Sequence, residues 1–502
     1  MIFESVSQLN NKEQFLEKVL VYIRLVEVLA EREKMVIPQI SKPSYEIIAE
    51  LRDMGIINSE NDISLLKKIV SSNYNRLLSA ISFYLSNQQI YGDLLDKLNN
   101  KKRKRLQDKE RKAKKPKMVD FFAGAGGLSC GFTQAGFKVC FANDFEDVCV
   151  RTYRYNHPEL PSQRVLKEDI RKIVANIDNY VDENVDIVVG GPPCQSFSSA
   201  NQRRIIDDPR NELYKYFIEA IKRLCPKFVV MENVRGMLSV AGQVVEDYKA
   251  IKIHRDGKDY TYDVAYRLLN SMNFGVAQSR ERLIYIAIRD DIAYSKHVTP
   301  EVLFQEIEKS CKNNKTVNLI DALEYIKPLD APRIKGMTEV DDEKTGMKIS
   351  YNTYDSCGNE YLSKINLGRS LPYVFNHKAR YCSDVNYEIF KRLDQGEDAT
   401  NPKIADIMPY ARRNGIFKDK YFKLYADRPC RTITAHLKMD CLSHIHPFQV
   451  RSITPREAAR VQSFPDDYLF LGAYLKTYMQ IGNAVPVLMA KQIANVIKRY
   501  IV

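Results

Sequence analysis

The sequence predicts a doubly wound α/β domain that is preceded by a helical extension and interrupted by a smaller, irregular region. Beyond residue 118, near-continuous runs of valine, isoleucine and phenylalanine alternate with helical segments, a pattern typical of a parallel sheet covered on both faces. Before residue 100, leucine and isoleucine recur at helical spacing instead. A hydrophobic content of 45% in 502 residues suffices for about two to four globular domains.

Residues 1–100 form the predicted helical extension. Its apolar residues repeat every three or four positions across 63–98 and, earlier, at Leu16, Leu20, Ile23, Val26 and Ala30. We interpret these stripes as the core of a helical domain. A helix-turn-helix regulator around Ser44 to Ala80 is an alternative that no residue there specifies.

Residues 101–117, KKRKRLQDKERKAKKPK, form a basic linker. This stretch carries +9 of the formal net charge of +13. Such a block is typical of a solvated, helical or disordered linker, and contact with nucleic-acid phosphates is an equal alternative at this point.

The ten cysteines are scattered through the chain and predict neither a disulfide framework nor a metal site. They include no CxxC pair and no Cys/His pairs at zinc-ligand spacing, so we expect reduced thiols. The N-terminal residues do not resemble a signal peptide, and no window reaches 18 consecutive apolar residues. We therefore expect a soluble cytoplasmic protein.

Five strands of the sheet are predicted from the apolar runs at 118–122, 138–144, 185–191, 227–234 and 282–288. From about 290 to 425 the sequence is rich in lysine, aspartate, asparagine and tyrosine without a clear period, which favours a separate irregular region. In the tail, Thr454 and Glu457 form a predicted capping box with Pro455 at the first helical position. The helix they begin is expected to end near Gln462.

A glycine-rich turn closes the first predicted strand in the segment DFFAGAGG. Gly124 and Gly126 would let the backbone approach a ligand beside the next helix, and Asp144 follows the second strand, where a carboxylate can bind a ribose. Alone, the pair fits a generic nucleotide site or merely a tight turn, and the incomplete GxGxxG pattern argues against NAD. An aromatic face and an acceptor for adenine could come from Phe145, Asp169 and Ile170.

A cysteine stands at the carboxyl end of another predicted strand, in GGPPCQSFS. Ligands of open α/β sheets bind at that edge, and the prolines and glycines favour a fixed, exposed thiol for Cys194. The other nine cysteines are expected to be small core residues. The next strand ends at Glu232, which would reach the same edge, although a carboxylate at a strand end is often only solvated.

Alternation along an extended segment sends Gln278, Arg280 and Arg282 to one face of the sheet. The simpler interpretation is a charged edge strand. The more specific one is a pair of guanidinium groups that lowers the pKa of the thiol and holds a pyrimidine ring or a phosphate.

Taken together, these motifs resemble the DNA cytosine-C5 methyltransferases. DFFAGAGGLSCGF, GGPPCQSFS, ENV, QSRER, TPREAARVQSFPDDY and QIGNAVP occur in the order of that family, over Met118–Ile292 and from Tyr425 onward. Asn211 stands where many members carry glycine. The resemblance implies a Rossmann-like S-adenosylmethionine-dependent methyltransferase domain. It also implies that this cofactor is bound by Phe122, Gly124, Gly126, Gly127, Asp144, Phe145, Asp169, Ile170, Pro193, Leu213 and Asn483.

The resemblance further implies the chemistry and the division of the chain. The thiolate of Cys194 would attack C6 of a flipped-out cytosine while Glu232 hydrogen-bonds the base, with Arg280 and Arg282 orienting it. Residues 118–293 would form the catalytic and cofactor-binding domain, 294–425 the target-recognition region that reads the major groove, and 426–502 a segment that returns to the catalytic domain.

The resemblance also implies partners and leaves two rivals. Double-stranded DNA would be the substrate of a monomer located at the nucleoid, paired with a restriction endonuclease that acts on the same site without a stable complex. With such a site, phosphate binding becomes the favoured role of the basic linker. A tRNA-directed enzyme would carry a Cys-Phe-Thr signature, which is absent between 290 and 425, and a catalytically silent DNA-binding regulator would lack Cys194, Glu232 or the arginines. For the extension, transcriptional regulation, dimerisation and a larger DNA footprint stay open.

Overall fold

The computed structural model describes most of the chain, namely residues 2–181, 184–193, 212–351, 358–371, 373–409 and 420–501. Cys194 lies outside the described residues. Among the described helices, none combines the length and the apolar character needed to cross a lipid bilayer.

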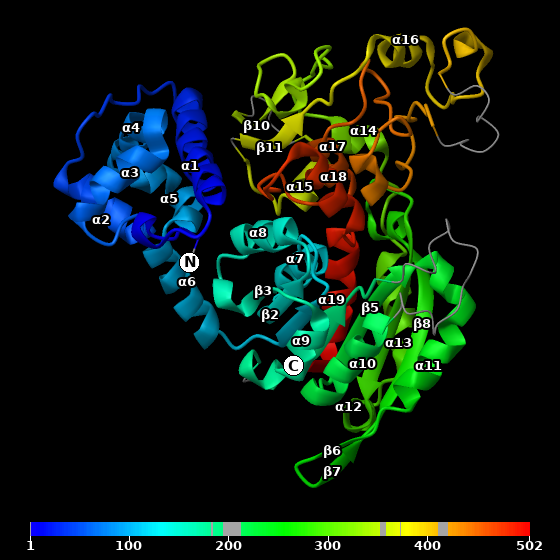
Figure 1. Ribbon diagram of the computed structural model, residues 1–502. Helices are drawn as coiled ribbons and strands as arrows, with labels where there is room; N and C mark the ends of the chain where they lie inside the picture. The colour runs from blue at the N-terminus through cyan, green and yellow to red at the C-terminus, as the bar shows by residue number, and fades with distance from the viewer. Residues whose placement is uncertain are drawn as a thin grey trace.

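A seven-stranded sheet forms the centre of the catalytic domain (Figure 1), with the strand order β3-β2-β1-β4-β5-β9-β8. Its strands are β1 (Lys117–Phe121), β2 (Lys138–Asp144), β3 (Val165–Lys167), β4 (Ile187–Gly190), β5 (Phe228–Val234), β8 (Tyr262–Asn270) and β9 (Glu281–Arg289). The order reverses between β2 and β4 on either side of β1, which opens a crevice at the carboxyl ends of these strands.

The expectation of a parallel sheet holds for β1 to β5 but is wrong for the last predicted strand. β9 pairs antiparallel with both β5 and β8. Only ten residues separate β8 from β9, which is too short for the crossover that parallel neighbours require. The fold is therefore a doubly wound α/β domain with an antiparallel edge.

Helices cover both faces of the sheet because successive strand residues point to opposite sides. Met118 belongs to one apolar core and Val119 to the other. The Met118 face is covered by α7 (Gly127–Gln134), α8 (Asp147–Asn156), α13 (Pro300–Cys311) and α19 (Val487–Ile501). The Val119 face is covered by α9 (Ile170–Ala175), α10 (Glu212–Leu224) and α11 (Ala241–Lys249).

The last part of the chain returns to the catalytic domain. α17 (Pro455–Val461) begins at the predicted capping box, since Thr454 accepts a hydrogen bond from the amide of Glu457 and the Glu457 carboxylate accepts one from the amide of Thr454. α18 (Tyr474–Asn483) follows, and α19 packs against α7 beside the sheet (Figure 1).

Within 294–425, the range expected to recognise the target, α13 packs against the central sheet, and the other α-helices and strands among the described residues are short. They are α14 (Leu319–Leu323), β10 (Gly346–Tyr351), α15 (Glu360–Ile365), β11 (Tyr373–Lys378) and α16 (Asp384–Arg392). β10 and β11 pair antiparallel. A second small hairpin, β6 (Ile253–Arg255) with β7 (Lys258–Tyr260), and α12 (Asp290–Lys296) lie at the far end of the catalytic domain (Figure 1).

The N-terminal part is helical, as its apolar stripes indicate. Its helices are α1 (Lys12–Glu33), α2 (Tyr45–Met54), α3 (Ile63–Val70), α4 (Tyr74–Ser86), α5 (Gln88–Leu95) and α6 (Asn100–Lys112). They enclose an apolar core that also includes a few side chains from β10, β11 and other later parts of the chain. α6 contains most of the basic segment, and its Arg103 is buried.

Candidate active site

The turn after β1 leaves an open stretch of backbone at the crevice. Phe122, Gly124 and Gly126 all adopt left-handed backbone conformations, with φ of 55°, 56° and 92°. A Cβ atom added at Gly124 would meet nothing within 4 Å. The neighbouring Gly127 is different, because a Cβ there would lie 2.6 Å from the Val485 carbonyl. Gly124 therefore leaves room for a ligand, while Gly127 allows the C-terminal segment to pack closely.

The carboxylate of Asp144 lies beside this turn. It accepts hydrogen bonds from the amides of Gly124, at 2.9 Å, and of Glu146, at 2.8 Å. Burial raises the pKa of Asp144, and these two amides oppose the rise. Next to it, the ring of Phe145 is 70% exposed, an unusual position for a large apolar side chain. An open glycine, a carboxylate and a free aromatic face fit the adenosyl part of S-adenosylmethionine.

The other residues expected at the cofactor occupy the borders of this crevice. Asp169 follows β3, caps α9 and pairs with Arg171 at 2.6 Å, while Ile170 is buried beneath it. Leu213, in the first turn of α10, packs in the same apolar cluster as Phe122.

Two further expected cofactor residues come from distant parts of the chain. Asn483 is exposed at the end of α18, next to the Ala484 side chain that packs near Gly127. Pro193 is partly buried and is the last described residue before Cys194.

Glu232 and Arg282 meet at the carboxyl end of β5. Arg282 Nε lies 2.6 Å from Glu232 Oε1, and both side chains are mostly buried. A Cβ atom on Gly191 would lie 2.9 Å from Glu232 Oε2, so the strand that leads to Cys194 passes directly against this carboxylate. The structure thus brings Glu232 and Arg282 together at the edge where the cysteine loop begins.

Arg280 points elsewhere. Its guanidinium is buried and donates to the carbonyls of Ile433, at 2.5 Å, and Gly482, at 2.8 Å. Burial lowers its pKa well below the ordinary value. Gln278 turns the same way and donates to Gln462 at 2.8 Å. Of the three residues expected on one face, only Arg282 reaches Glu232, and the other two hold the C-terminal segment.

Sequence reasoning missed Asn233, which holds the start of the cysteine loop. Its amide nitrogen donates to the Pro192 carbonyl at 3.0 Å, and the side chain is buried. The pattern that could have identified it is its place in ENV, because a buried asparagine at a strand end needs partners for its amide.

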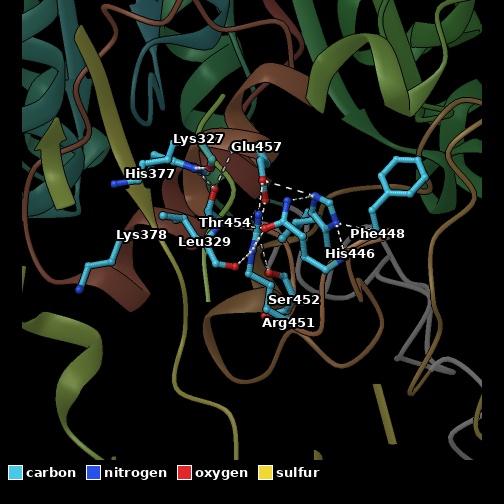
Figure 2. A network of polar contacts seen from close by, with 12 residues as sticks. Lys327, Leu329, His377, Lys378, His446, Phe448, Arg451, Ser452, Thr454 and Glu457 are labelled. Carbon is cyan, nitrogen blue, oxygen red and sulfur yellow. Dashed lines mark hydrogen bonds and ion pairs between the residues drawn. The ribbon is translucent and has the colours of Figure 1, made fainter. Parts of the chain in front are cut away.

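A buried polar network joins α17 to the recognition region (Figure 2). Glu457 accepts two hydrogen bonds from Arg451, at 2.7 and 2.8 Å, in addition to its capping role. His377 of β11 contacts Thr454 and the Lys327 carbonyl, and burial lowers its pKa to about 4, so the ring is neutral at pH 7. The network holds β11 and the segment around Lys327 and Leu329 against the start of α17.

The strand order and the glycine-rich turn after β1 define the class of fold, a Rossmann-like α/β sheet with room for a ligand at the carboxyl ends of its strands. A model of the C-5 cytosine-specific DNA methylase family matches residues 116–499. The chain belongs to this family of C-5 cytosine-specific DNA methylases, and DNA is its substrate.

Relatives of known activity agree with this assignment. The type II methyltransferase M.DdeI of Desulfomicrobium norvegicum is 31% identical over 402 residues, which cover 76% of this chain and 88% of that protein. The type II methyltransferase M.AgeI of Thalassovita gelatinovora is 30% identical over 436 residues, covering 76% and 99%. A prophage-encoded protein of E. coli has the same fold, with a TM-score of 0.58, 24% identity and coverage of 76% and 99%. The N-terminal helices precede the family match.

Proposed function

We propose that the chain transfers a methyl group from S-adenosylmethionine to C5 of a flipped-out cytosine in a short, specific duplex sequence, with Cys194 as the nucleophile. The observation that carries this proposal is the ion pair of Glu232 and Arg282 against Gly191, three residues before the cysteine. It supports the proposal because a fixed carboxylate beside the segment that leads to the cysteine can hydrogen-bond a base that the thiol attacks.

The chemistry follows from these positions. The thiolate of Cys194 adds to C6 of the cytosine, forming an S–C6 bond and making C5 nucleophilic. A proton shared between Glu232 and N3 and a hydrogen bond that Glu232 accepts from the exocyclic amine favour the addition, and Arg282 keeps the carboxyl group in place. After methylation, a base removes the C5 proton, the S–C6 bond breaks and the thiolate is regenerated. Arg280 acts through the C-terminal segment that it anchors and is a positioning residue.

The cofactor, when bound, supplies an electrophilic methyl group on its sulfonium. Gly124 and Gly126 would let it approach the backbone, Asp144 would accept hydrogen bonds from its ribose, and Phe145 would pack on its adenine. Asp169, Ile170 and Leu213 complete the adenosine side. Phe122, Gly127, Pro193 and Asn483 border the methionine side and the cysteine loop.

The biological setting proposed is that of a modification enzyme. Its relatives are named type II methyltransferases, the class that accompanies restriction endonucleases. Residues 294–425 would read the target bases, and the enzyme would act as a monomer on DNA. The partner endonuclease would recognise the same sequence without a stable complex.

Bisulfite sequencing of plasmids tests the reaction. Plasmid from cells expressing the wild type should resist bisulfite conversion at one cytosine of a short motif. Plasmid from cells expressing Cys194→Ser or Glu232→Gln should be converted at that cytosine. Unmodified DNA from all three strains, with folded proteins that bind S-adenosylmethionine, would overturn the proposal. Transfer RNA from the same cells, sequenced in parallel, would then identify an RNA substrate.

A further inference from the structure

The helical extension is docked on the rest of the protein through a common apolar core. Its buried side chains form one cluster with residues of two other parts of the chain, the β10–β11 hairpin and the catalytic domain. The partners outside the extension are Tyr155, Ile349, Tyr373, Phe375, Leu469 and Leu471. These apolar side chains would be exposed without the extension, so the extension is an integral part of the folded enzyme.

One carboxylate on α1 contacts three separate parts of the protein. Glu17 lies 2.7 Å from Arg151 Nη1 of α8 and 2.7 Å from Lys348 Nζ of β10, and it accepts a hydrogen bond from the amide of Gly472 at 2.9 Å. Burial would raise the pKa of Glu17, but Lys348, Gly472 and Arg151 together hold it below the ordinary value. The carboxylate is thus ionised at neutral pH and paired on all sides.

The hairpin is held from both sides. On the α1 side, Arg24 donates to the Ile349 carbonyl at 3.2 Å. On the other side, Arg456 of α17 donates to the Phe375 carbonyl at 2.6 Å. Figure 1 shows α1 beside β10 and α17 beyond β11, as their contacts require. The hairpin therefore cannot shift without breaking contacts to α1 or α17.

The extension is also fixed to the cofactor half of the catalytic domain. Arg103 of α6 donates to the Arg154 carbonyl at 2.8 Å, and Gln107 donates to the Pro158 carbonyl at 3.1 Å. Both acceptors lie at α8 or just after it, and α8 follows the cofactor carboxylate Asp144. Glu17 and α6 therefore hold one helix of the cofactor half at two points.

We propose that the helical extension is a brace for sequence recognition, in which Glu17 is the positioning residue that fixes the β10–β11 hairpin relative to α8. The extension then sets how the recognition region is aligned with the cofactor and the flipped base. This inference rests on the proposed function, because it concerns the choice of DNA sequence by that same site.

The test compares full-length variants on DNA. Glu17→Gln, Lys348→Met and the double variant are assayed for methylation of the cognate motif and of motifs that differ by one base pair. The matched control is Asp53→Asn, which loses a 2.8 Å ion pair with Lys101 of α6 that involves neither the β10–β11 hairpin nor α8. KM for DNA, kcat and the unfolding temperature are measured for each.

Each brace variant should lower the preference for the cognate motif about tenfold and raise KM for DNA, while kcat at saturating cognate DNA changes less than about twofold. The double variant should lose no more than Glu17→Gln alone, because the ion pair with Lys348 is already broken in that single variant. Asp53→Asn should keep the wild-type preference. If Glu17→Gln does not fold, Lys348→Met carries the test, and the conservative Lys348→Arg should keep the wild-type preference.

A lower unfolding temperature with an unchanged preference would overturn the brace, because a merely structural role reduces methylation of all motifs equally. Additive losses in the double variant would also overturn it. A wild type that methylates no DNA at all would instead be a failure of the proposed function, so the two failures are distinguishable.

Discussion

Arg282 Nε lies 2.6 Å from Glu232 Oε1, and the two side chains project from neighbouring antiparallel strands, β9 and β5. Arg282 is in register with Val234, two residues beyond the glutamate. The pairing of the strands thus fixes the distance between the two groups. The carboxylate is held in one orientation before any base enters the site.

Replacing Arg282 should reduce catalysis. Arg282→Met leaves the Glu232 carboxylate without its partner, and kcat should fall by about 10²–10³, the usual loss for one preorganised charge-stabilising group. Arg282→Lys keeps the charge but not the planar guanidinium, so a smaller loss is expected. Single-turnover methylation of a cognate duplex measures both, and a wild-type rate for Arg282→Met would contradict the assigned role.

Replacing Arg280 should reduce stability. Arg280→Met leaves the buried carbonyls of Ile433 and Gly482 without donors, which should lower the free energy of unfolding by about 2–5 kcal/mol. The control is Arg267→Met, which breaks a surface ion pair with Glu301 and should cost less than about 1 kcal/mol. Urea unfolding measures the stability of both variants. Equal unfolding midpoints for Arg280→Met and Arg267→Met would contradict the structural role of Arg280.

Two glycines that are three residues apart, Gly124 and Gly127, should respond differently to replacement by alanine. Gly124→Ala places a methyl group in open space at a positive φ, so S-adenosylmethionine should bind roughly tenfold more weakly while the protein still folds. Gly127→Ala drives a methyl group against the Val485 carbonyl and should cost about 1–3 kcal/mol of stability. Calorimetric titration and thermal unfolding separate the effects. An unchanged affinity of Gly124→Ala for S-adenosylmethionine would contradict the role of Gly124 in cofactor binding.

Asp120 should make the protein less stable as pH rises. Burial raises its pKa to about 7 from an ordinary 3.8, and Ser129, which donates at 2.5 Å, opposes the rise. Between these values the folded protein holds a proton that the unfolded chain has lost, so stability falls as pH increases through this window, by at most about 1.4 kcal/mol per pH unit. Asp120→Asn should remove this slope. If the urea midpoints of the wild type and of Asp120→Asn change equally between pH 5 and 7, Asp120 is not the source of the pH dependence.

Much of the sheet could be predicted from the sequence because buried strands are apolar throughout. The five predicted runs correspond to β1, β2, β4, β5 and β9. β8 was missed because it is an edge strand with exposed and half-exposed positions, including Asp263. The direction of β9 was also missed, since an apolar run carries no information on strand direction and the short connection to β8 was not recognised.

The candidate site was predicted only as far as local motifs reach. The turn at Gly124 and the carboxylate of Asp144 are 20 residues apart and follow adjacent strands, so their contact was foreseeable. The partners of Arg280 lie 153 and 202 residues further along the chain, and no local pattern identifies them. The charged residues of α17 are also buried by partners that no local pattern identifies, whereas charged side chains are ordinarily expected at the surface.

The packing of α19 against α7 has a consequence for synthesis on the ribosome. By the time β9 emerges, the nascent chain already contains every residue assigned to the chemistry, from Cys194 to Arg282. The apolar face of α7 stays uncovered until α19 has followed, more than 350 residues after it. A chain whose synthesis stops before α19 therefore exposes the apolar face of α7, and such exposed surface makes an incomplete chain prone to aggregation.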